Sequence, residues 1–449
     1  MNKKKWALLL LAAILIFGYI KLFYKTYNEK TVPQTADYIV AVDVKRITNT
    51  LIWQFLTTPG QWKNISFSSK KSKELSWKDM VELPDYVLAF HAANQPAAVW
   101  YVLLTIKDKT DFEKGLVQFQ FEKINTNEYL NKTAGLYLFV HDNKVLVANT
   151  LASNKDYVLA VADELFTKKT FISKDKLAKA IDAKSHLAVY IPANNFLQKE
   201  AVIKANFDKQ KVEITGDLTP VSNYVFTEKN FSYSSGSLCA VGFTQPQTAV
   251  YNLLSITDKE KISTALNFNI DSVMQTGNNW YSLNLAQIKT RADSAVTYTY
   301  DDEFNQVEKV TVNNIQEPAF SFIVTGNNPS QFYNYLQNNS KLEATAAGSL
   351  FLPMPLVKSY CNIASDTQLV ISSAGYSNVN TDRSIQAVFF IHLFISRIPE
   401  NLKNYFPDAV KNSLSNLETI HISSVKKDAQ LLLKTVIEKK KNDSPIIHF

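Results

Sequence analysis

The sequence predicts an α+β fold: an N-terminal transmembrane helix followed by two tandem, mostly antiparallel α+β modules that look like an internal duplication. Three observations lead to this prediction. An apolar run opens the chain, strand-like segments joined by hairpins mix with isolated helices, and similar segments recur in the same order. Hairpin-joined strands are typical of antiparallel sheets, whereas a doubly wound fold needs glycine-rich phosphate turns and this chain has only 11 glycines.

The first expected element is an uncleaved membrane anchor over 6–24. Three lysines precede a run of residues without charge, and the bulky residues at 21–25 do not offer the small side chains that signal peptidase needs. We expect a cytoplasmic tail at 1–5, a single span of the inner (cytoplasmic) membrane and a linker at 25–35. The remaining chain is then expected in the periplasm or outside the cell. Lysines lie on both sides of the run, so the positive-inside rule favours this orientation only slightly.

Two modules are expected after the linker, module 1 at 36–220 and module 2 at 221–440, followed by a C-terminal tail at 441–449. The segment YIVAVDVKRITNTLIWQFL from Tyr38 aligns without gaps with SLCAVGFTQPQTAVYNLLS from Ser237. Each reads as an apolar strand, a short polar break and a helix, so the two modules are expected to begin alike.

Further pairs of segments follow in the same order. VWYVLLTIKDKTDFEKGL from Val99 aligns with AFSFIVTGNNPSQFYNYL from Ala319, which places Leu116 over Leu336. Hairpin-like or strand-like pairs then begin at Tyr137 and Tyr360, at His186 and Ile385, and at Lys211 and Gln430. The alternative to a duplication is two unrelated α+β domains with similar local patterns.

Module 2 contains a hairpin that module 1 lacks. AVTYTYDDEFNQVEKVTV from Ala295 alternates apolar and polar residues on both arms, around the acidic group Asp301, Asp302 and Glu303. We interpret the acidic group as a solvated turn at the hairpin tip, and a cation site is the alternative.

Composition and motifs point to no reaction. The net charge is +7, but the arginines are few and isolated, so nucleic-acid binding is not expected. The sequence has no glycine-rich phosphate motif and no nucleophile elbow, and its 6 histidines are dispersed without the spacing of metal ligands. We therefore assign no catalytic, cofactor-binding or metal-ligating residue, and expect no cofactor.

Cys239 and Cys361 are the two cysteines of the chain. In an oxidising compartment they could form a disulfide bond. The alternative is that both are small buried apolar residues, since each lies in a strand-like segment.

The stretch VPQTADYIVAVDVKRI resembles the opening of a class of bacterial membrane-anchored envelope proteins that contain a domain of unknown function. Their ectodomains begin with Pro-x-x-Ala and an apolar strand ending in Val-Asp, soon after an N-terminal transmembrane helix; Pro33, Ala36 and Asp43 match this pattern. The hairpin LYLFVHDNKVLVANT, with Asp142 and Asn143 at its turn, is similar to a second feature of the class. The resemblance implies an envelope protein, carries over no functional residue and favours a non-catalytic role.

The leading hypothesis is a single-pass, membrane-anchored extracytoplasmic protein with a non-catalytic ectodomain that binds or scaffolds an envelope partner. Two alternatives stay open: a hydrolase-like extracytoplasmic enzyme assembled from distant residues, and a carrier of a lipid or another apolar ligand. Segments that do not recur between the modules are the candidate partner contacts, and the alternative is that both are loops that fold back onto their own modules. They are WKNISFSSKKSKELSWKDM, with Trp62, Phe67 and Trp77, and LEATAAGSLFLPMPL from Leu342 with its uncharged FLPMPL run.

Overall fold

The computed structural model describes residues 24–57, 75–222, 226–244, 255–267, 269–271, 280–300, 304–354, 357–373, 381–403, 411 and 414–440. Contacts divide the chain into two compact units. Unit 1 is Met1–Thr219 with Lys441–Phe449, and unit 2 is Pro220–Lys440. Each unit has antiparallel strands that pair with one another, and hydrophobic clusters of its own.

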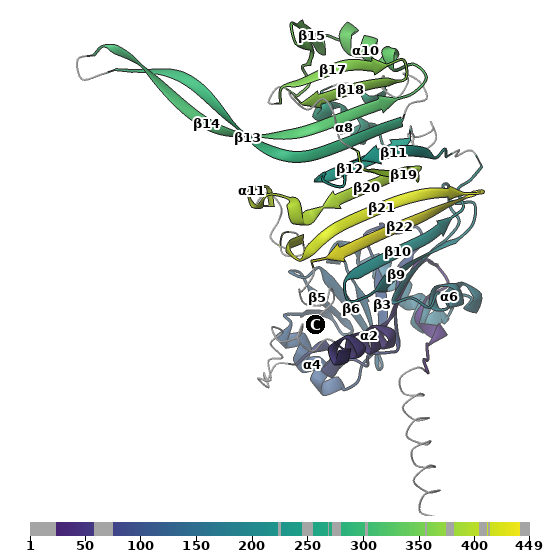
Figure 1. The fold of residues 1–449 in the computed structure, drawn as a ribbon. Helices are drawn as coiled ribbons and strands as arrows, with labels where there is room; N and C mark the ends of the chain where they lie inside the picture. Colours follow the sequence, from purple (N-terminus) through teal and green to yellow (C-terminus); the bar gives the residue numbers. More distant parts are fainter. Residues whose placement is uncertain are drawn as a thin grey trace, which may run out of the picture. The chain divides into compact units, whose positions relative to one another are not determined.

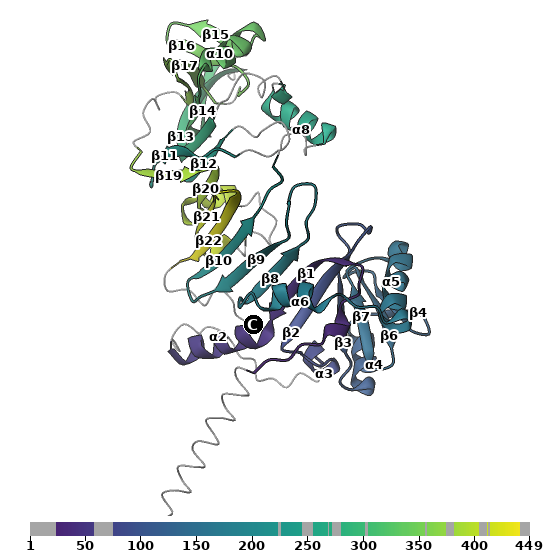
Figure 2. The same ribbon diagram turned by 90° about the vertical axis from the view of Figure 1, so that its right-hand side faces the viewer.

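Unit 1 contains an antiparallel sheet whose described strands run in the order β4–β5–β6–β7–β3–β2–β1–β8–β9–β10 (Figure 1 and Figure 2). Their bounds are β1 (Ala36–Asp43), β2 (Tyr86–Ala92), β3 (Tyr101–Thr105), β4 (Glu122–Asn125), β5 (Glu128–Asn131), β6 (Leu136–His141), β7 (Lys144–Ala148), β8 (Leu187–Ile191), β9 (Ala201–Phe207) and β10 (Lys211–Leu218). Every pairing joins strands by hydrogen bonds between antiparallel neighbours, as the hairpin pattern of the sequence predicts.

Several helices of unit 1 bury apolar side chains that recur every three or four residues. α4 (Lys109–Gln118) begins after Asp108, whose side chain accepts a hydrogen bond from the Asp111 N–H, and it buries Phe112 and Leu116. α5 (Lys155–Ala162) lies against β6 (Figure 2). The other helices are η1 (Glu29–Thr31), α2 (Val44–Thr57), α3 (Trp77–Met80), η3 (Ala152–Asn154), the π-helical η4 (Asp163–Lys168) and α6 (Lys174–Ile181).

Two hydrophobic clusters form the core of unit 1. One includes the stacked rings of Phe90 and Tyr101, whose centroids are 5.6 Å apart, and the other includes Met80 and Leu138. Burial of each such side chain stabilises the fold by about 1.5–3 kcal/mol. Val32 is also fully buried in the first cluster, so the segment before β1 packs with this unit.

Unit 2 contains an antiparallel sheet whose described strands run in the order β15–β16–β17–β18–β14–β13–β12–β20–β21–β22 (Figure 1). Their bounds are β12 (Cys239–Thr244), β13 (Trp280–Tyr300), β14 (Gln306–Thr325), β15 (Leu342–Thr345), β16 (Gly348–Phe351), β17 (Ser359–Ser365), β18 (Gln368–Ser373), β20 (Phe389–Phe394), β21 (Leu417–Lys427) and β22 (Gln430–Lys439). A separate two-stranded sheet pairs β11 (Lys229–Tyr233) with β19 (Arg383–Ala387). The helices are α8 (Ile256–Leu266), α10 (Pro329–Asn338), η5 (Ile395–Arg397) and α11 (Glu400–Lys403).

The order of strand pairings is the same in the two units. β1 to β3 correspond to β12 to β14, β4 to β7 correspond to β15 to β18, and β8 to β10 correspond to β20 to β22. Leu116 of α4 and Leu336 of α10 also occupy equivalent positions in the two units. Both are buried, and each carbonyl accepts a hydrogen bond from the N–H five residues later, at Phe121 and Lys341.

The predicted fold class is wrong. The described residues form mostly antiparallel strands, and no helix among them is long and apolar enough to cross a membrane, so a fold that begins with a transmembrane helix is not supported. The predicted anchor at 6–24 lies outside the described residues except for Tyr24.

Candidate functional site

Histidines and acidic residues do not gather into a metal centre in the described part of the chain. Within it, no group of three His, Cys, Asp or Glu side chains could hold a metal ion. His91 is held by Asp37, with 2.7 Å between the His Nδ1 and Asp Oδ1 atoms, and His392 faces His421 across β20 and β21. His186 is different because it lines a small cavity in unit 1.

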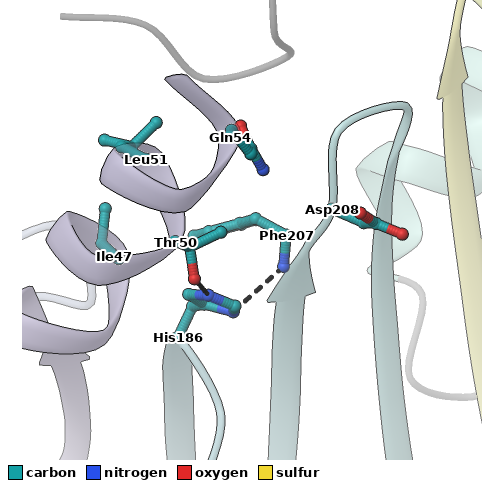
Figure 3. Close-up of a pocket in the computed structure, with 7 residues that line it drawn as sticks. All are labelled: Ile47, Thr50, Leu51, Gln54, His186, Phe207 and Asp208. Atoms are coloured by element: carbon teal, nitrogen blue, oxygen red, sulfur yellow. Dashed lines mark hydrogen bonds between the residues drawn. The ribbon is translucent and has the colours of Figure 1, made fainter. Parts of the chain in front are cut away.

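The cavity lies between α2 and the end of β9 (Figure 3). The Nε2 atom of His186 is 2.8 Å from Thr50 Oγ1, and its Nδ1 atom accepts a 3.1 Å hydrogen bond from the backbone N–H of Phe207. The volume is about 10 Å³, which barely holds one water molecule. The remaining lining residues are Ile47, Leu51, Gln54 and Asp208.

The two hydrogen bonds fix the proton on His186. Since Nδ1 accepts from a backbone N–H, the neutral ring carries its proton on Nε2 and donates it to Thr50. Burial lowers the pKa of His186 below its usual value, which keeps the ring neutral. A general base must accept the proton of its nucleophile, and neither ring nitrogen is available for that. The Thr50–His186 pair therefore holds α2 in place and is not a nucleophile with its base.

A larger pocket adjoins the cavity on the same helix. Its volume is about 740 Å³, and Thr50, Gln54 and Asp208 line both spaces. A volume of this size falls within the range of small-molecule sites, which is roughly 300–1,000 Å³. The other lining residues are apolar (Ile52, Trp53 and Leu56) or polar (Lys25, Arg46, Asn49 and Lys209). We call this space the α2 pocket.

Asp43 caps the start of α2 and also forms an ion pair with Lys25, which lines the α2 pocket. Its Oδ1 atom accepts a 2.8 Å hydrogen bond from the N–H of Arg46, which caps the helix, and its Oδ2 atom pairs with the Lys25 ammonium. The carboxylate is almost fully buried, so the ion pair compensates a charge that water cannot reach. Burial, together with the charge of Asp43, raises the pKa of Tyr86 to about 12. Asp43, the aspartate of the Val-Asp pattern noted in the sequence, therefore serves as the N-terminal cap of α2.

The predicted contact residues Trp62 and Phe67 lie outside the described residues. Trp77 opens α3, and its ring stacks on Phe119 with centroids 5.4 Å apart and meets Phe121 edge-on at 6.3 Å. Trp77 therefore packs against the core of unit 1.

The second predicted contact segment, from Leu342, forms β15, β16 and the turn after them. Phe351 is buried in the core of unit 2 and Met354 packs against that core, whereas Leu352 is exposed. The FLPMPL run is therefore anchored at two of its positions. The acidic group 301–303 lies outside the described residues.

Cys239 and Cys361 are both free thiols, so the structure does not join them. Cys239 begins β12 and Cys361 lies inside β17, where it belongs to the core of unit 2. Burial raises the pKa of both thiols, that of Cys361 to about 12. Both thiols therefore stay protonated at neutral pH and are poor nucleophiles.

A second candidate surface lies on unit 2, where β13 and β14 continue past the other strands (Figure 1). β12 pairs with β13 only at 280–285, and β18 pairs with β14 only at 321–325. Beyond these rows, 287–300 and 306–319 pair only with each other among the described residues. At about 3.4 Å per residue, this two-stranded ribbon is roughly 45 Å long.

One face of the ribbon carries a cluster of exposed apolar side chains. Val296 lies directly opposite Val310, and Tyr298 and Val312 flank this pair on the same face, because residues two apart on a strand point the same way. These four side chains are 53% to 61% exposed. We call the four residues the ribbon face.

The sequence patterns predicted neither candidate surface. The ribbon face had a visible signal, since valine and tyrosine alternate with threonine from Val296 to Thr299. In the α2 pocket, Arg46 and Lys209 are far apart in the chain, and no local pattern predicts that the turn after β9 lies beside α2.

Comparisons with known proteins give no family. No family model matches the chain. No curated protein matches it either. Among solved structures, the chain is similar to the structure of crystal form III of TP0453, with 11% sequence identity and a TM-score of 0.28. The similarity covers 54% of this chain and 87% of that chain.

Proposed function

We propose that this chain is a non-catalytic binding protein that acts in the cell envelope, and that the ribbon face holds a protein partner. The single observation that carries the proposal is the ribbon itself. A two-stranded ribbon is marginally stable in water, and this one keeps four large apolar side chains exposed far from the core of its unit.

A protein partner could cover the exposed apolar side chains of the ribbon and also pair with the outer edges of its strands. Its apolar face loses water when another apolar surface covers it, at about 25 cal/mol for each Å² removed. The outer edges of both strands also carry backbone N–H and C=O groups outside the ladder that joins β13 to β14, and another strand can pair with such groups. A small ligand would only cover the apolar side chains.

The runner-up, an extracytoplasmic hydrolase, has less support. Its best candidate pair, Thr50 and His186, has the wrong proton arrangement for nucleophilic catalysis. Support for a location in the envelope comes from the resemblance at Pro33, Ala36 and Asp43, and the partner test below also examines the location.

The first prediction concerns the ribbon. A photo-crosslinking residue placed at Val310 is expected to capture a specific envelope protein in intact cells. The same residue at Lys309, which points to the opposite face of the same strand, is expected to capture little. The measurement is the yield and identity of the crosslinked product at the two positions.

A matched variant separates contact from folding. Tyr298→Ser is expected to abolish the crosslink from position 310 and to change the free energy of unfolding by less than about 0.5 kcal/mol, because the side chain is exposed. Equal capture from both faces, or unchanged capture in Tyr298→Ser, would contradict a role for the ribbon face. A cytosolic partner would contradict the proposed location.

A further inference from the structure

The second half of α2 presents apolar side chains to water on unit 1. Trp53 and Leu56 are 67% and 64% exposed, and Ile52 is 49% exposed. All three line the α2 pocket. An amphipathic helix normally buries its apolar stripe, so this end of α2 has an apolar surface that the described residues of its unit leave uncovered.

Three cations, Lys25, Arg46 and Lys209, also line the same pocket. Lys25 is neutralised by Asp43, but no described residue forms an ion pair with the side chain of Arg46 or of Lys209. The one carboxylate of the lining, Asp208, accepts a 2.6 Å hydrogen bond from the backbone N–H of Lys209. The lining therefore has an excess of positive charge, and two of its cations are available to an anion.

The spacing along α2 separates the charge from the apolar side chains. Arg46 and Trp53 are seven residues apart, which puts them on one face of the helix with about 10 Å between them along its axis. Leu56 lies about 15 Å from Arg46 along the axis. An occupant that matches both ends is anionic at one end and apolar over the next 10–15 Å.

We propose that the α2 pocket binds a single-chain anionic amphiphile, such as a fatty acid. The acid group contacts Arg46 and Lys209, and the hydrocarbon chain lies along Trp53, Ile52 and Leu56. The pocket of about 740 Å³ is large enough for one such molecule. This inference concerns unit 1 alone and does not depend on the ribbon or its partner.

Simpler occupants match only part of the lining. A small inorganic anion would pair with the two cations and leave the apolar half exposed. An uncharged lipid would cover the apolar half and leave both cations without a partner. The amphiphile combines a charge-assisted contact with apolar burial, and each contribution can be removed separately by substitution.

The second prediction is the test of this site. Calorimetric titration of the full chain with dodecanoate is expected to give saturable binding of one molecule. Dodecanol and acetate are each expected to bind at least tenfold more weakly, since each lacks one half of the ligand. Arg46→Gln is expected to weaken dodecanoate binding about tenfold or more, because it removes a charge-assisted hydrogen bond to the acid group.

Matched variants control for charge and for surface apolarity. Lys176→Gln removes an exposed lysine of α6, and Val117→Ala trims a side chain of α4 that is 78% exposed; both are expected to bind dodecanoate like the parent chain. Leu56→Ala is expected to weaken binding severalfold without lowering the melting temperature. Lys209→Gln repeats the charge test in a surface turn if Arg46→Gln does not fold.

Three results would overturn the proposal. The first is acetate binding as tight as dodecanoate binding, which would make the site a plain anion site. The second is unchanged dodecanoate affinity in both Arg46→Gln and Lys209→Gln. The third is binding to phosphatidylglycerol vesicles without any binding of monomeric dodecanoate, which would make the surface a membrane contact.

Discussion

At the scale of single residues, His392 of unit 2 is a histidine that is difficult to protonate in the folded protein, because it is buried beside His421. Their Nδ1 atoms are 3.2 Å apart, and the Nε2 atom of His392 is buried without a hydrogen-bond partner among the described residues. Burial, and then the neighbouring His421, lower the pKa of His392 to about 4. The charges of Arg383 and Arg397 contribute to this lowering of the pKa, and Glu438 opposes it. The folded chain therefore binds this proton much less readily than the unfolded chain.

The third prediction follows from the sign of that difference. The unfolded chain takes up the proton near pH 6.5 and the folded chain only near pH 4, so stability is lost as the pH falls between these values. Between about pH 7.5 and pH 5, His392 alone is expected to cost unit 2 about 2 kcal/mol. His392→Phe is expected to lose less stability over this range, as measured by urea denaturation at both pH values. A pH dependence equal to that of the parent chain would contradict the assignment.

At the scale of elements, two glycines let neighbouring elements approach closely. A Cβ atom at Gly115 of α4 would lie 2.3 Å from the sulfur of Met80. Met80 is the last residue of α3, so the glycine allows α3 and α4 to pack closely. A Cβ atom at Gly242 of β12 would lie 2.4 Å and 2.7 Å from the rings of Phe390 and Phe231. The difference between the two places is the stiffness of the neighbour, since methionine can change rotamer and a packed ring cannot.

The fourth prediction compares these two sites. Gly242→Ala is expected to lower the free energy of unfolding by about 1–3 kcal/mol through overpacking of the rings. Gly115→Ala is expected to cost less, because alanine also stabilises a helix by about 1 kcal/mol relative to glycine. Urea denaturation of both variants gives the comparison, and a larger loss for Gly115→Ala would show that the Met80 side chain cannot move aside.

At the scale of the whole molecule, the hydrophobic clusters divide as the two units do. Every residue of two clusters belongs to unit 1, and every residue of the other two belongs to unit 2. A defect in one core therefore removes no contact from the core of the other unit. Leu116 and Leu336 allow a matched comparison, since they occupy the same place in α4 and α10 and are both buried.

The fifth prediction uses that match. Leu116→Ala and Leu336→Ala are each expected to cost about 2–5 kcal/mol. Hydrogen exchange measured by mass spectrometry is expected to accelerate in β3 and β7 for Leu116→Ala and in β14 and β18 for Leu336→Ala. Val117→Ala, on the exposed side of α4, provides the control. Equal acceleration in both units after either substitution would show that they unfold together.

Sequence patterns predicted the local elements better than their arrangement. The helix that contains Leu116 and the hairpin from Ala295 have strong periodicity, and both form. The hairpin is longer than predicted, because segments such as AQIKTRA pair as strands without a regular alternation. The predicted fold class was wrong because it included a transmembrane helix, and the only basis for that helix was the apolar run at the start of the chain. The α2 pocket could not be predicted, since it depends on contacts between distant residues.

The position of the two thiols gives the molecule a built-in reporter. Cys239 and Cys361 both lie in unit 2, and Cys361 is 1% exposed. A thiol reagent can reach Cys361 only when β17 separates from its neighbours, so the labelling rate of this residue measures how often that part of the sheet opens. Unit 1 contributes no thiol to this signal. The labelling kinetics of the unmodified chain would therefore report the opening rate of unit 2 alone, because unit 1 contains no cysteine.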